Sequence, residues 1–366
     1  MASLFDLLRN YFVDQFIPLV TGIVGMYLVG AVAVAICVAI YAFIGMRLGY
    51  WPKTKLLRRE ALWFFVFIAP WIIGFIFFRG IPILASMYLS FTRYNVATME
   101  WVGFTQYSRL FEDQVFYKSL QVSAYYTLLS VPVGLTASLG LAMLLNINRM
   151  PFLGTFRTLY YIPSLVASSV AVALLFQWLL NPSFGVVNYL IGFFVGPNGL
   201  IPLGLAGPRW FYDVNWVVPS FVLLSLWGFG GPMLIYLAGL QGVPTTLYEA
   251  ATIDGAGLWR QFWNVTLPMI SPVILFTFIT GIIGSFQIFT PAYVISGGTG
   301  GSFGGPAYAS MFYVLYLYLN AFRRFRFGYA AAQAWILFIV IFVLTILALR
   351  VSRQSVYYEN PGDAAF

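Results

Sequence analysis

Long apolar runs separated by short polar or basic segments dominate the chain. Each run is long enough, at about 1.5 Å per helical residue, to cross the roughly 30 Å hydrocarbon core of a bilayer. The runs cover residues 17–46, 61–78, 120–145, 158–180, 216–240, 271–295 and 329–350. The pattern predicts an all-α integral membrane protein with about seven transmembrane helices.

The first 60 residues form a segment of their own. In residues 1–16, Phe5, Leu8 and Phe12 fall near one helical face, which predicts an interfacial amphipathic helix before the first span, so that residues 1–48 hold both. Residues 49–60 overlap the densest basic cluster of the chain, which predicts a cytoplasmic linker and an N-terminus on the outer side.

Composition supports membrane insertion and excludes several kinds of chemistry. The chain is 61% hydrophobic and 8% charged, whereas soluble domains carry about 25% charged residues. It contains no histidine and one cysteine, Cys37, so imidazole catalysis, histidine metal sites and an internal disulfide are excluded. The net charge of +8 fits basic residues that flank spans and contact membrane lipid, so no nucleic acid partner is expected.

The most polar segment between two apolar runs is YEAATIDGAGLWRQFWNVTLP, residues 248–268. Thr246 and Glu249 have the spacing of a capping box, and Gly255 suits a left-handed helix end. These residues predict a helix that begins near Pro244 and ends at a glycine bend.

A second helical piece follows the bend. Leu258, Trp259, Phe262 and Trp263 are spaced to share one face, and Pro268 is expected to end the piece. An apolar face of this size on a loop indicates a surface for a partner.

No energy source is evident within the chain itself. No Asp, Glu, Lys or Arg lies in the middle of a predicted span, which argues against proton coupling. The glycine-rich segment 296–306 lacks the GK[ST] of a phosphate-binding loop. The chain is therefore not expected to be an enzyme, and a partner would have to supply the energy.

The spans on either side of the polar loop are the best candidates to line a path for substrate. Glycines flank Trp227, small and polar residues follow one another along 281–287, and aromatic residues lie nearby. The candidate path residues are Trp227, Gly231, Gly284, Gln287, Phe289 and Tyr293. Glycines that pack helices and aromatics that sit in interfacial belts are an alternative explanation of the same residues.

The polar loop resembles the EAA loop of ABC importer permeases, whose pattern is E-A-A-x3-G-x9-I-x-L-P. Every position matches except the Ile, which is Val265 here. The likeness extends over about 61–353 and is greatest to sugar permeases of the maltose type, as in SMYLSFTRYN, WVGFTQYSRLFED and the FGYA at 327–330. It implies a six-helix transporter domain, an extra N-terminal helix and a cytoplasmic coupling loop at 244–268.

In that family the loop docks on a separate ATPase subunit. The docking residues that the resemblance implies are Glu249, Ala250, Ala251, Asp254, Gly255, Leu258, Phe262, Leu267 and Pro268. It also implies a second homologous permease in a heterodimer, two ATPase subunits that hold ATP and Mg²⁺, and an extracytoplasmic solute-binding protein. This chain would bind no cofactor itself.

The resemblance further implies import of a di- or oligosaccharide by alternating access across a bacterial or archaeal cytoplasmic membrane. The EAA loop and the tail 354–366 would be cytoplasmic, and the loops 92–119, 181–215 and 296–328 would face the binding protein. Arg323, Arg324 and Arg326 then fall outside, against the positive-inside tendency.

Two other classes of transporter remain open. An ion-coupled secondary transporter or a channel would act alone and show related halves, and no convincing internal repeat is present. An ABC permease for glycerol phosphate or a polyamine would need basic or acidic residues in its spans, which offer neither.

Overall fold

Helices form almost every regular element of the described chain. The structure, a computed structural model, describes residues 55–95, 98–147, 152–166, 169–196, 200–201, 207–298 and 303–352. The predicted interfacial helix, the first span, most of the 49–60 linker and the tail 354–366 lie outside the described residues. The prediction of an all-α fold is confirmed, with one short β-hairpin as the only strands in the described ranges.

The chain divides into two units, Met1–Tyr88 and Leu89–Phe366. Most of the described part of unit 1 is helical: α3 (Lys55–Phe75) continues through a π-helical turn, η2 (Ile76–Gly80), into α4 (Ile81–Ser90), which runs into unit 2. The stretch that could span a membrane is Pro70–Ser90. The predicted span at 61–78 is therefore displaced.

Arg79 corrects a second prediction. It lies near the middle of the apolar stretch Pro70–Ser90, with its side chain exposed, so the expectation that no span carries a charge near its centre is wrong. Pro82 does not interrupt the helix, and the N–H of Ile81 bonds to the carbonyl of Ile76 in a wide turn. Proline has no backbone N–H and cannot donate to the carbonyl four positions back. In a π-helical turn the residue before the proline bonds five positions back, so the helix continues without that bond.

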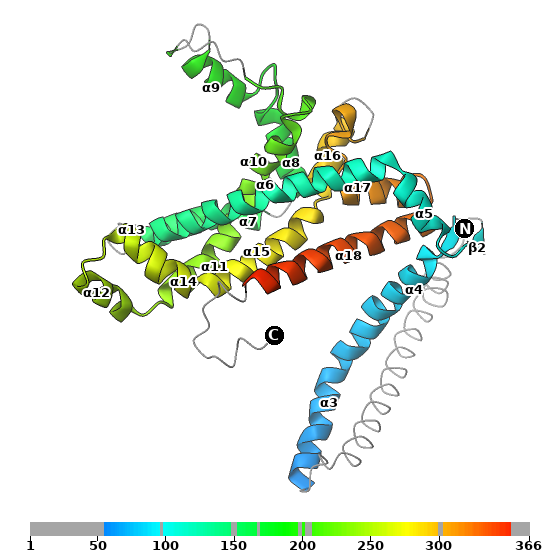
Figure 1. Cartoon of the computed structure of the whole chain (residues 1–366), viewed down its shortest axis with the longest axis horizontal. Helices are drawn as coiled ribbons and strands as arrows, with labels where there is room; N and C mark the ends of the chain where they lie inside the picture. Colours follow the sequence, from blue (N-terminus) through cyan, green and yellow to red (C-terminus); the bar gives the residue numbers. More distant parts are fainter. Residues whose placement is uncertain are drawn as a thin grey trace, which may run out of the picture. The chain divides into compact units, whose positions relative to one another are not determined.

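Helix α6 (Gln114–Leu145) is the long central element of unit 2 (Figure 1). It contacts α10 (Val217–Ser225), α11 (Gly230–Gln241) and α15 (Ser271–Phe286), and α18 (Phe327–Ser352) packs on α15. The predicted spans 120–145 and 329–350 fall within α6 and α18.

Two hydrophobic clusters lie on either half of α6. One gathers α6, α10 and α17 (Tyr313–Tyr318) around rings such as Phe221 and Phe312, whose centroids are 4.9 Å apart. The other joins the last turns of α6 to α11 around Tyr236 and Ile270. The core of unit 2 is thus built from helices distant in sequence.

The predicted span 271–295 falls within the apolar stretch Ser271–Gly297, which is long enough to span a membrane, whereas the predicted spans 158–180 and 216–240 are broken helices. α7 (Leu153–Leu165) and α8 (Ser169–Leu179) meet at 103°, and α10 with its 3-10 extension η4 (Leu226–Gly228) meets α11 at 55°. Among described residues, four helices are long and apolar enough to span, or up to six if each bent pair is one span. At the second bend a Cβ on Gly230 would lie 2.1 Å from the carbonyl oxygen of Tyr160, so glycine permits α11 to approach α7.

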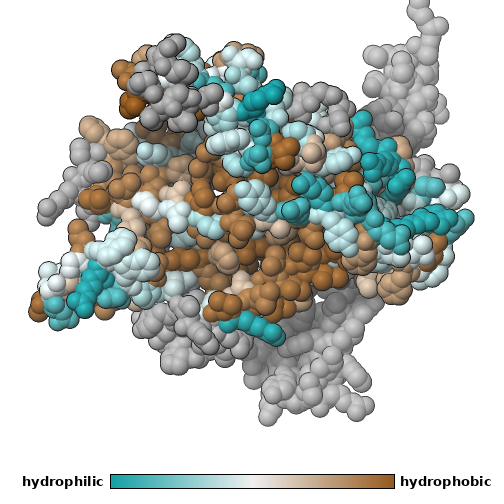
Figure 2. Space-filling model, turned by 45° about the horizontal axis from the view of Figure 1, so that its top comes forward, coloured by the Kyte–Doolittle hydropathy of each residue, from teal (hydrophilic) through white to brown (hydrophobic). Residues whose placement is uncertain are grey.

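Shorter elements connect these helices. They are β1 (Thr92–Tyr94), β2 (Met99–Trp101), α5 (Thr105–Glu112), α9 (Val186–Val195), η3 (Trp210–Tyr212), α12 (Thr245–Ile253), α13 (Leu258–Gln261), η5 (Phe262–Thr266), α14 (Leu267–Met269), α16 (Thr290–Gly298), η6 (Pro306–Tyr308) and η7 (Leu319–Arg323). The elements α17 and η7 follow each other directly and form one short helical segment, Tyr313–Arg323. Figure 2 shows hydrophobic residues over the middle of one face and hydrophilic residues gathered toward the ends, as expected of a bundle within a membrane.

Candidate functional site

The polar loop folds as helix, glycine bend and helix, as predicted. Helix α12 ends at Ile253, and Gly255 adopts a left-handed φ of 73°. The N–H of Gly255 bonds to the carbonyl of Thr252 at 3.0 Å, and that of Ala256 to the carbonyl of Ala251 at 2.9 Å. These bonds satisfy carbonyls that a helix end otherwise leaves open.

Two details of the predicted loop are wrong. Thr246 and Glu249 form no capping box, because α12 already begins at Thr245 with Pro244 as its N-cap and no side-chain cap. Pro268 does not end the second helix. The N–H of Leu267 bonds to the carbonyl of Phe262 in the π-helical turn η5, and the chain stays helical to Met269.

Apolar side chains cover much of the outer surface of the loop. Ile253, Leu258 and Trp259 are 86%, 85% and 73% exposed. Trp259 stacks on Phe262 at 5.9 Å and meets Trp263 edge-on at 5.8 Å. We call Ile253, Leu258, Trp259 and Trp263 the loop patch. The sequence pattern missed Ile253, which lies on α12 outside the predicted face.

Hydrogen bonds tie the two halves of the loop together. Gln261 Nε2 donates to Thr252 Oγ1 at 3.1 Å and to the carbonyl of Ala256 at 2.9 Å. The hydroxyls of Tyr248 and Thr266 lie 3.0 Å apart. Tyr248 and Val265 also pack on the second hydrophobic cluster, so the loop is in contact with the cluster that contains residues of α11 and α15.

The predicted docking residues fall in two places. Glu249, Ala250, Asp254 and Gly255 are exposed together with Leu258, while Ala251 and Phe262 are half-buried. Leu267 and Pro268 are half-buried at the foot of the loop, where they also line an apolar groove against α18. The structure therefore brings most of these residues to one loop, and their role in docking stays a prediction.

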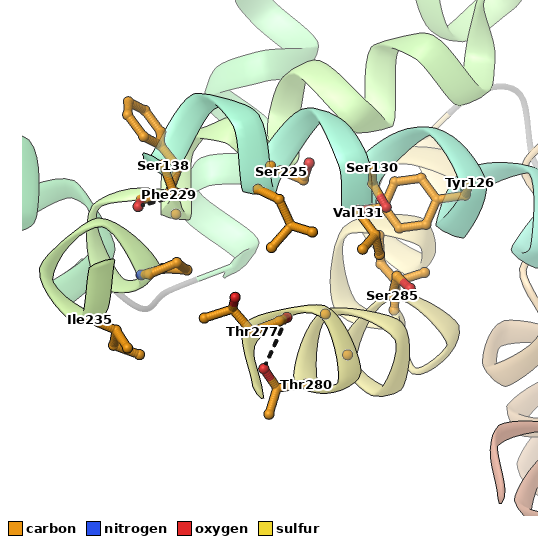
Figure 3. A pocket seen from close by; sticks show the side chains of 17 residues that line it. Tyr126, Ser130, Val131, Ser138, Ser225, Phe229, Ile235, Thr277, Thr280 and Ser285 are labelled. Carbon is orange, nitrogen blue, oxygen red and sulfur yellow. Dashed lines mark hydrogen bonds between the residues drawn. The ribbon is translucent and has the colours of Figure 1, made fainter. Parts of the chain in front are cut away.

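A cavity of about 400 Å³ opens between α6, the α10–α11 bend and α15 (Figure 3). None of its lining residues is charged, and many carry hydroxyls. The hydroxyl-bearing residues are Tyr126, Ser130, Ser138, Ser225, Thr277, Thr280 and Ser285. We call this space the hydroxyl cavity.

Several of these hydroxyls donate within the protein. Ser225 Oγ donates to the carbonyl of Val222 at 2.7 Å, Thr280 Oγ1 to that of Phe276 at 2.9 Å, and Ser285 Oγ to that of Ile282 at 3.0 Å. A hydroxyl that donates its single proton still has lone pairs to accept with. The hydroxyl cavity is thus suited to a neutral ligand rich in donors.

The predicted path residues do not form one site. Gly284 lines the hydroxyl cavity, but the other five are absent from its lining. Trp227 packs edge-on against Phe176 at 6.1 Å. Phe289 and Tyr293 join a cluster with Tyr318, at 4.9 and 5.4 Å between ring centroids.

The sequence did contain a signal for the hydroxyl cavity. Ser130, Gly134 and Ser138 recur every fourth residue on α6, and Thr277, Gly281 and Ser285 do so on α15. Such spacing places small residues on one helical face. The α6 stripe was missed because it lies more than a hundred residues before the loop.

Asp113 organises the opposite end of α6. Its carboxylate accepts from the backbone N–H of Val115 at 2.8 Å and from the hydroxyls of Tyr329, at 2.7 Å, and Tyr316. Burial raises the pKa of Asp113, but these hydrogen bonds outweigh it and hold the pKa below its usual value. The carboxylate is therefore a charged N-cap that joins three elements.

The bundle of long apolar helices indicates a polytopic membrane protein, and comparison with known proteins identifies its family. Residues 130–356 match the family described as "Binding-protein-dependent transport system inner membrane component". The chain belongs to this family. It is accordingly a multi-pass membrane protein and a permease subunit of an ABC importer, and the prediction of a permease without enzyme activity is confirmed.

Curated relatives cover most of the chain. It is 38% identical over 313 residues to the probable ABC transporter permease protein YesP of Bacillus subtilis, covering 85% of this chain and 97% of that protein. It is 34% identical over 293 residues to the lactose transport system permease protein LacF of Rhizobium radiobacter, covering 79% and 93%. The predicted resemblance to sugar permeases is confirmed.

A solved structure has the same fold. The structure of a bacterial ABC transporter involved in the import of the acidic polysaccharide alginate matches with a TM-score of 0.68 at 23% identity. The match covers 82% of this chain and 98% of that one. It supports the helical arrangement of the transporter domain.

Proposed function

We propose that this permease imports a neutral di- or oligosaccharide by alternating access. A solute-binding protein delivers the sugar, a second homologous permease completes the path, and two ATPase subunits that hold ATP and Mg²⁺ drive the change. The observation that carries the proposal is the hydroxyl cavity, which is uncharged and lies between helices on both sides of the loop.

The chemistry of the hydroxyl cavity favours a sugar over charged solutes. A sugar presents many hydroxyl donors, which the free lone pairs of serine and threonine can accept. A phosphate ester would leave its charge without a basic partner there, and a polyamine would lack an acidic one. Relatives named for lactose and for arabinooligosaccharides agree with this choice.

The loop is the proposed contact with the ATPase. The loop patch is apolar and exposed at one end of unit 2, so burial by a partner would remove it from water. The internal hydrogen bonds let the loop move as one piece, and its packing on α11 and α15 carries the motion to two walls of the hydroxyl cavity. In this proposal the loop and the C-terminus lie in the cytoplasm, on the side of the ATPase subunits.

A transport assay tests the path. The assembled transporter in liposomes, with its binding protein, should accumulate labelled lactose or arabinooligosaccharide but not glycerol phosphate. Gly284→Leu fills open space at the hydroxyl cavity, since nothing lies within 4 Å of a Cβ there, and should lower uptake at least tenfold. Gly140→Leu is the matched control, because it also meets open space on α6 but lies outside the lining. Equal loss in both variants would contradict the assigned path.

A pull-down tests the coupling. Wild-type permease should bring down an ATPase and a second permease, whereas Glu249→Lys and Gly255→Asp should lose the ATPase and keep the second permease. A chain that purifies alone and transports solute without ATP would instead establish a secondary transporter or channel.

A further inference from the structure

A second cavity, of about 380 Å³, lies at the end of unit 2 that carries α5, and Figure 1 places α12 at the opposite end of α6. It draws arginines from β1, α5 and the start of α18. Its lining residues are Arg93, Tyr94, Asn95, Gln106, Arg109, Asp113, Arg326 and Tyr329. We call it the arginine pocket.

The walls of the arginine pocket are held in place. Gln106 Nε2, which is buried, donates to the carbonyl of Thr92 at 3.0 Å, and this bond fastens β1 to α5. A Cβ on Gly328 would lie 2.0 Å from the same carbonyl oxygen, so β1 also rests directly on the first turn of α18. Contacts within unit 2 therefore fix the positions of β1, α5 and α18 around the pocket.

The charges of the pocket are not balanced from within. Arg93 pairs with Glu100 at 3.7 Å, which is the one ion pair among described residues. Asp113 accepts from two tyrosine hydroxyls and from backbone N–H groups rather than from an arginine. Arg109 and Arg326 consequently face the pocket without a carboxylate partner in the described ranges, which favours an anionic occupant.

The pocket lies where the apolar helices end. Asp113 directly precedes α6, and Arg326 directly precedes α18. The 26 residues of α18 extend over about 39 Å, which exceeds the roughly 30 Å hydrocarbon core and reaches into the headgroup layer. Two helices that are long and apolar enough to span a membrane thus begin beside the arginine pocket, as expected of a site near the headgroup layer.

Exposed aromatic side chains surround the same elements. Phe104 and Phe111 are seven positions apart, on the face of the amphipathic segment around α5 that lies opposite the pocket-lining Gln106 and Arg109, and are 74% and 53% exposed. Tyr117, one turn into α6, is also exposed. Aromatic rings beside arginines are typical of a membrane interface, where the rings pack on lipid and the cations meet phosphate.

We propose that the arginine pocket binds the phosphate of an anionic phospholipid, in the leaflet opposite the α12–α13 loop. The guanidinium groups of Arg109 and Arg326 hold the phosphate oxygens, and Phe104 and Phe111, on the opposite face of α5, pack on neighbouring lipid. The bound headgroup completes the charge of the pocket and fastens the β-hairpin, α5 and α18 to the membrane surface.

Native mass spectrometry of the assembled transporter, extracted from phosphatidylcholine nanodiscs with added phosphatidylglycerol, tests this proposal. Wild type should retain phosphatidylglycerol, and Arg109→Gln with Arg326→Gln should retain at least tenfold less. The control, Lys118→Gln with Arg209→Gln, removes two positive charges outside the pocket and should behave as wild type. Thermal unfolding of each complex checks that the variants fold.

The remaining outcomes would overturn the proposal. Equal retention of phosphatidylglycerol by all variants would show that the lipid does not bind in the arginine pocket. Stabilisation of wild type by inorganic phosphate to the same degree as by phosphatidylglycerol would show a site for a free anion. Unchanged lipid retention, together with salt-sensitive loss of binding-protein stimulation in the pocket variant, would assign the pocket to a carboxylate of that protein.

Discussion

At the scale of single residues, glycines in the loop have different roles that the sequence alone does not separate. Gly255 has a φ of 73°, whereas Gly257 has a φ of −69°. A Cβ on either residue would meet open space. Any difference between substitutions at the two positions therefore reports backbone conformation and not crowding.

Gly255→Ala should weaken the bend by about 1 kcal/mol, because an L-residue is strained in the left-handed region. Local opening of the loop should rise about fivefold, seen as faster amide hydrogen exchange at residues 255 and 256. Gly257→Ala should leave exchange within twofold of wild type. Equal effects at the two positions would mean that the bend does not depend on the left-handed conformation.

Residue-level chemistry at the substrate path was only partly predictable. The sequence indicated Gly284, because a glycine near the loop in a polar stripe is conspicuous. Trp227 and Phe289 lie outside the lining of the hydroxyl cavity, and their role in the path stays a prediction, since aromatic rings near a path and aromatic rings that pack between helices look the same without their neighbours. Phe176, which packs on Trp227, comes from a helix about fifty residues earlier in the chain.

At the scale of elements, two helices continue past prolines, one of which, Pro268, the sequence predicted to be a helix end. A π-helical turn ends at Gly80 two residues before Pro82, and another ends at Thr266 two residues before Pro268. In both, the residue between turn and proline donates to the carbonyl five positions back. Sequence rules assign a proline to a helix end because they assume regular α-helical bonding on both sides.

Asp113 is expected to stabilise the joint between α6, α17 and α18. Asp113→Ala removes the helix cap and leaves the hydroxyls of Tyr316 and Tyr329 without their acceptor, at a cost of about 2–4 kcal/mol. Thermal unfolding of the assembled complex should show it. The control is Asp213→Ala, which removes a local turn bond to the N–H of Asn215 and should cost about 1 kcal/mol or less.

The stability that Asp113 contributes should depend on pH in one direction. Because its folded pKa lies below the unfolded value of about 3.9, the contribution is complete above that value and is lost as the pH falls through the folded pKa. The difference between wild type and Asp113→Asn should accordingly be constant near neutral pH and shrink below about pH 4. A difference that grows on acidification would contradict a charged carboxylate at this joint.

At the scale of the whole molecule, the hydrophobic core of the described residues lies within unit 2. Both hydrophobic clusters consist of residues from Tyr107 onward, all within unit 2. The apolar pattern predicted the membrane class and the spans α6 and α18. It could not predict the bends in the fourth and fifth spans, because these depend on contacts such as that of Gly230 with Tyr160 from another helix.

Deletion of residues 2–46 should therefore leave a permease that inserts, assembles and transports at no less than about half the wild-type rate. This deletion keeps the basic residues 47–59, which predict the orientation of the next span. A longer deletion, 2–60, removes them and should reduce correct insertion, measured by protease access to the loop at 245–269. Loss of assembly in the shorter deletion would assign a structural role to the first span.

The wide turn at Phe262–Thr266 has a consequence for how the loop tolerates change in length. A π-helical turn holds one residue more than an α-helical turn, so the nine residues between Gly255 and Val265 include one that regular winding would not need. Excision of a single residue there would close the turn and rotate everything on its N-terminal side by about 100° around the helix axis. Leu258 and Trp259 would then face a different direction around the helix axis, although every side chain of the loop patch would still be present. The spacing of the motif thus fixes the direction in which the loop patch faces as well as the residues that it presents.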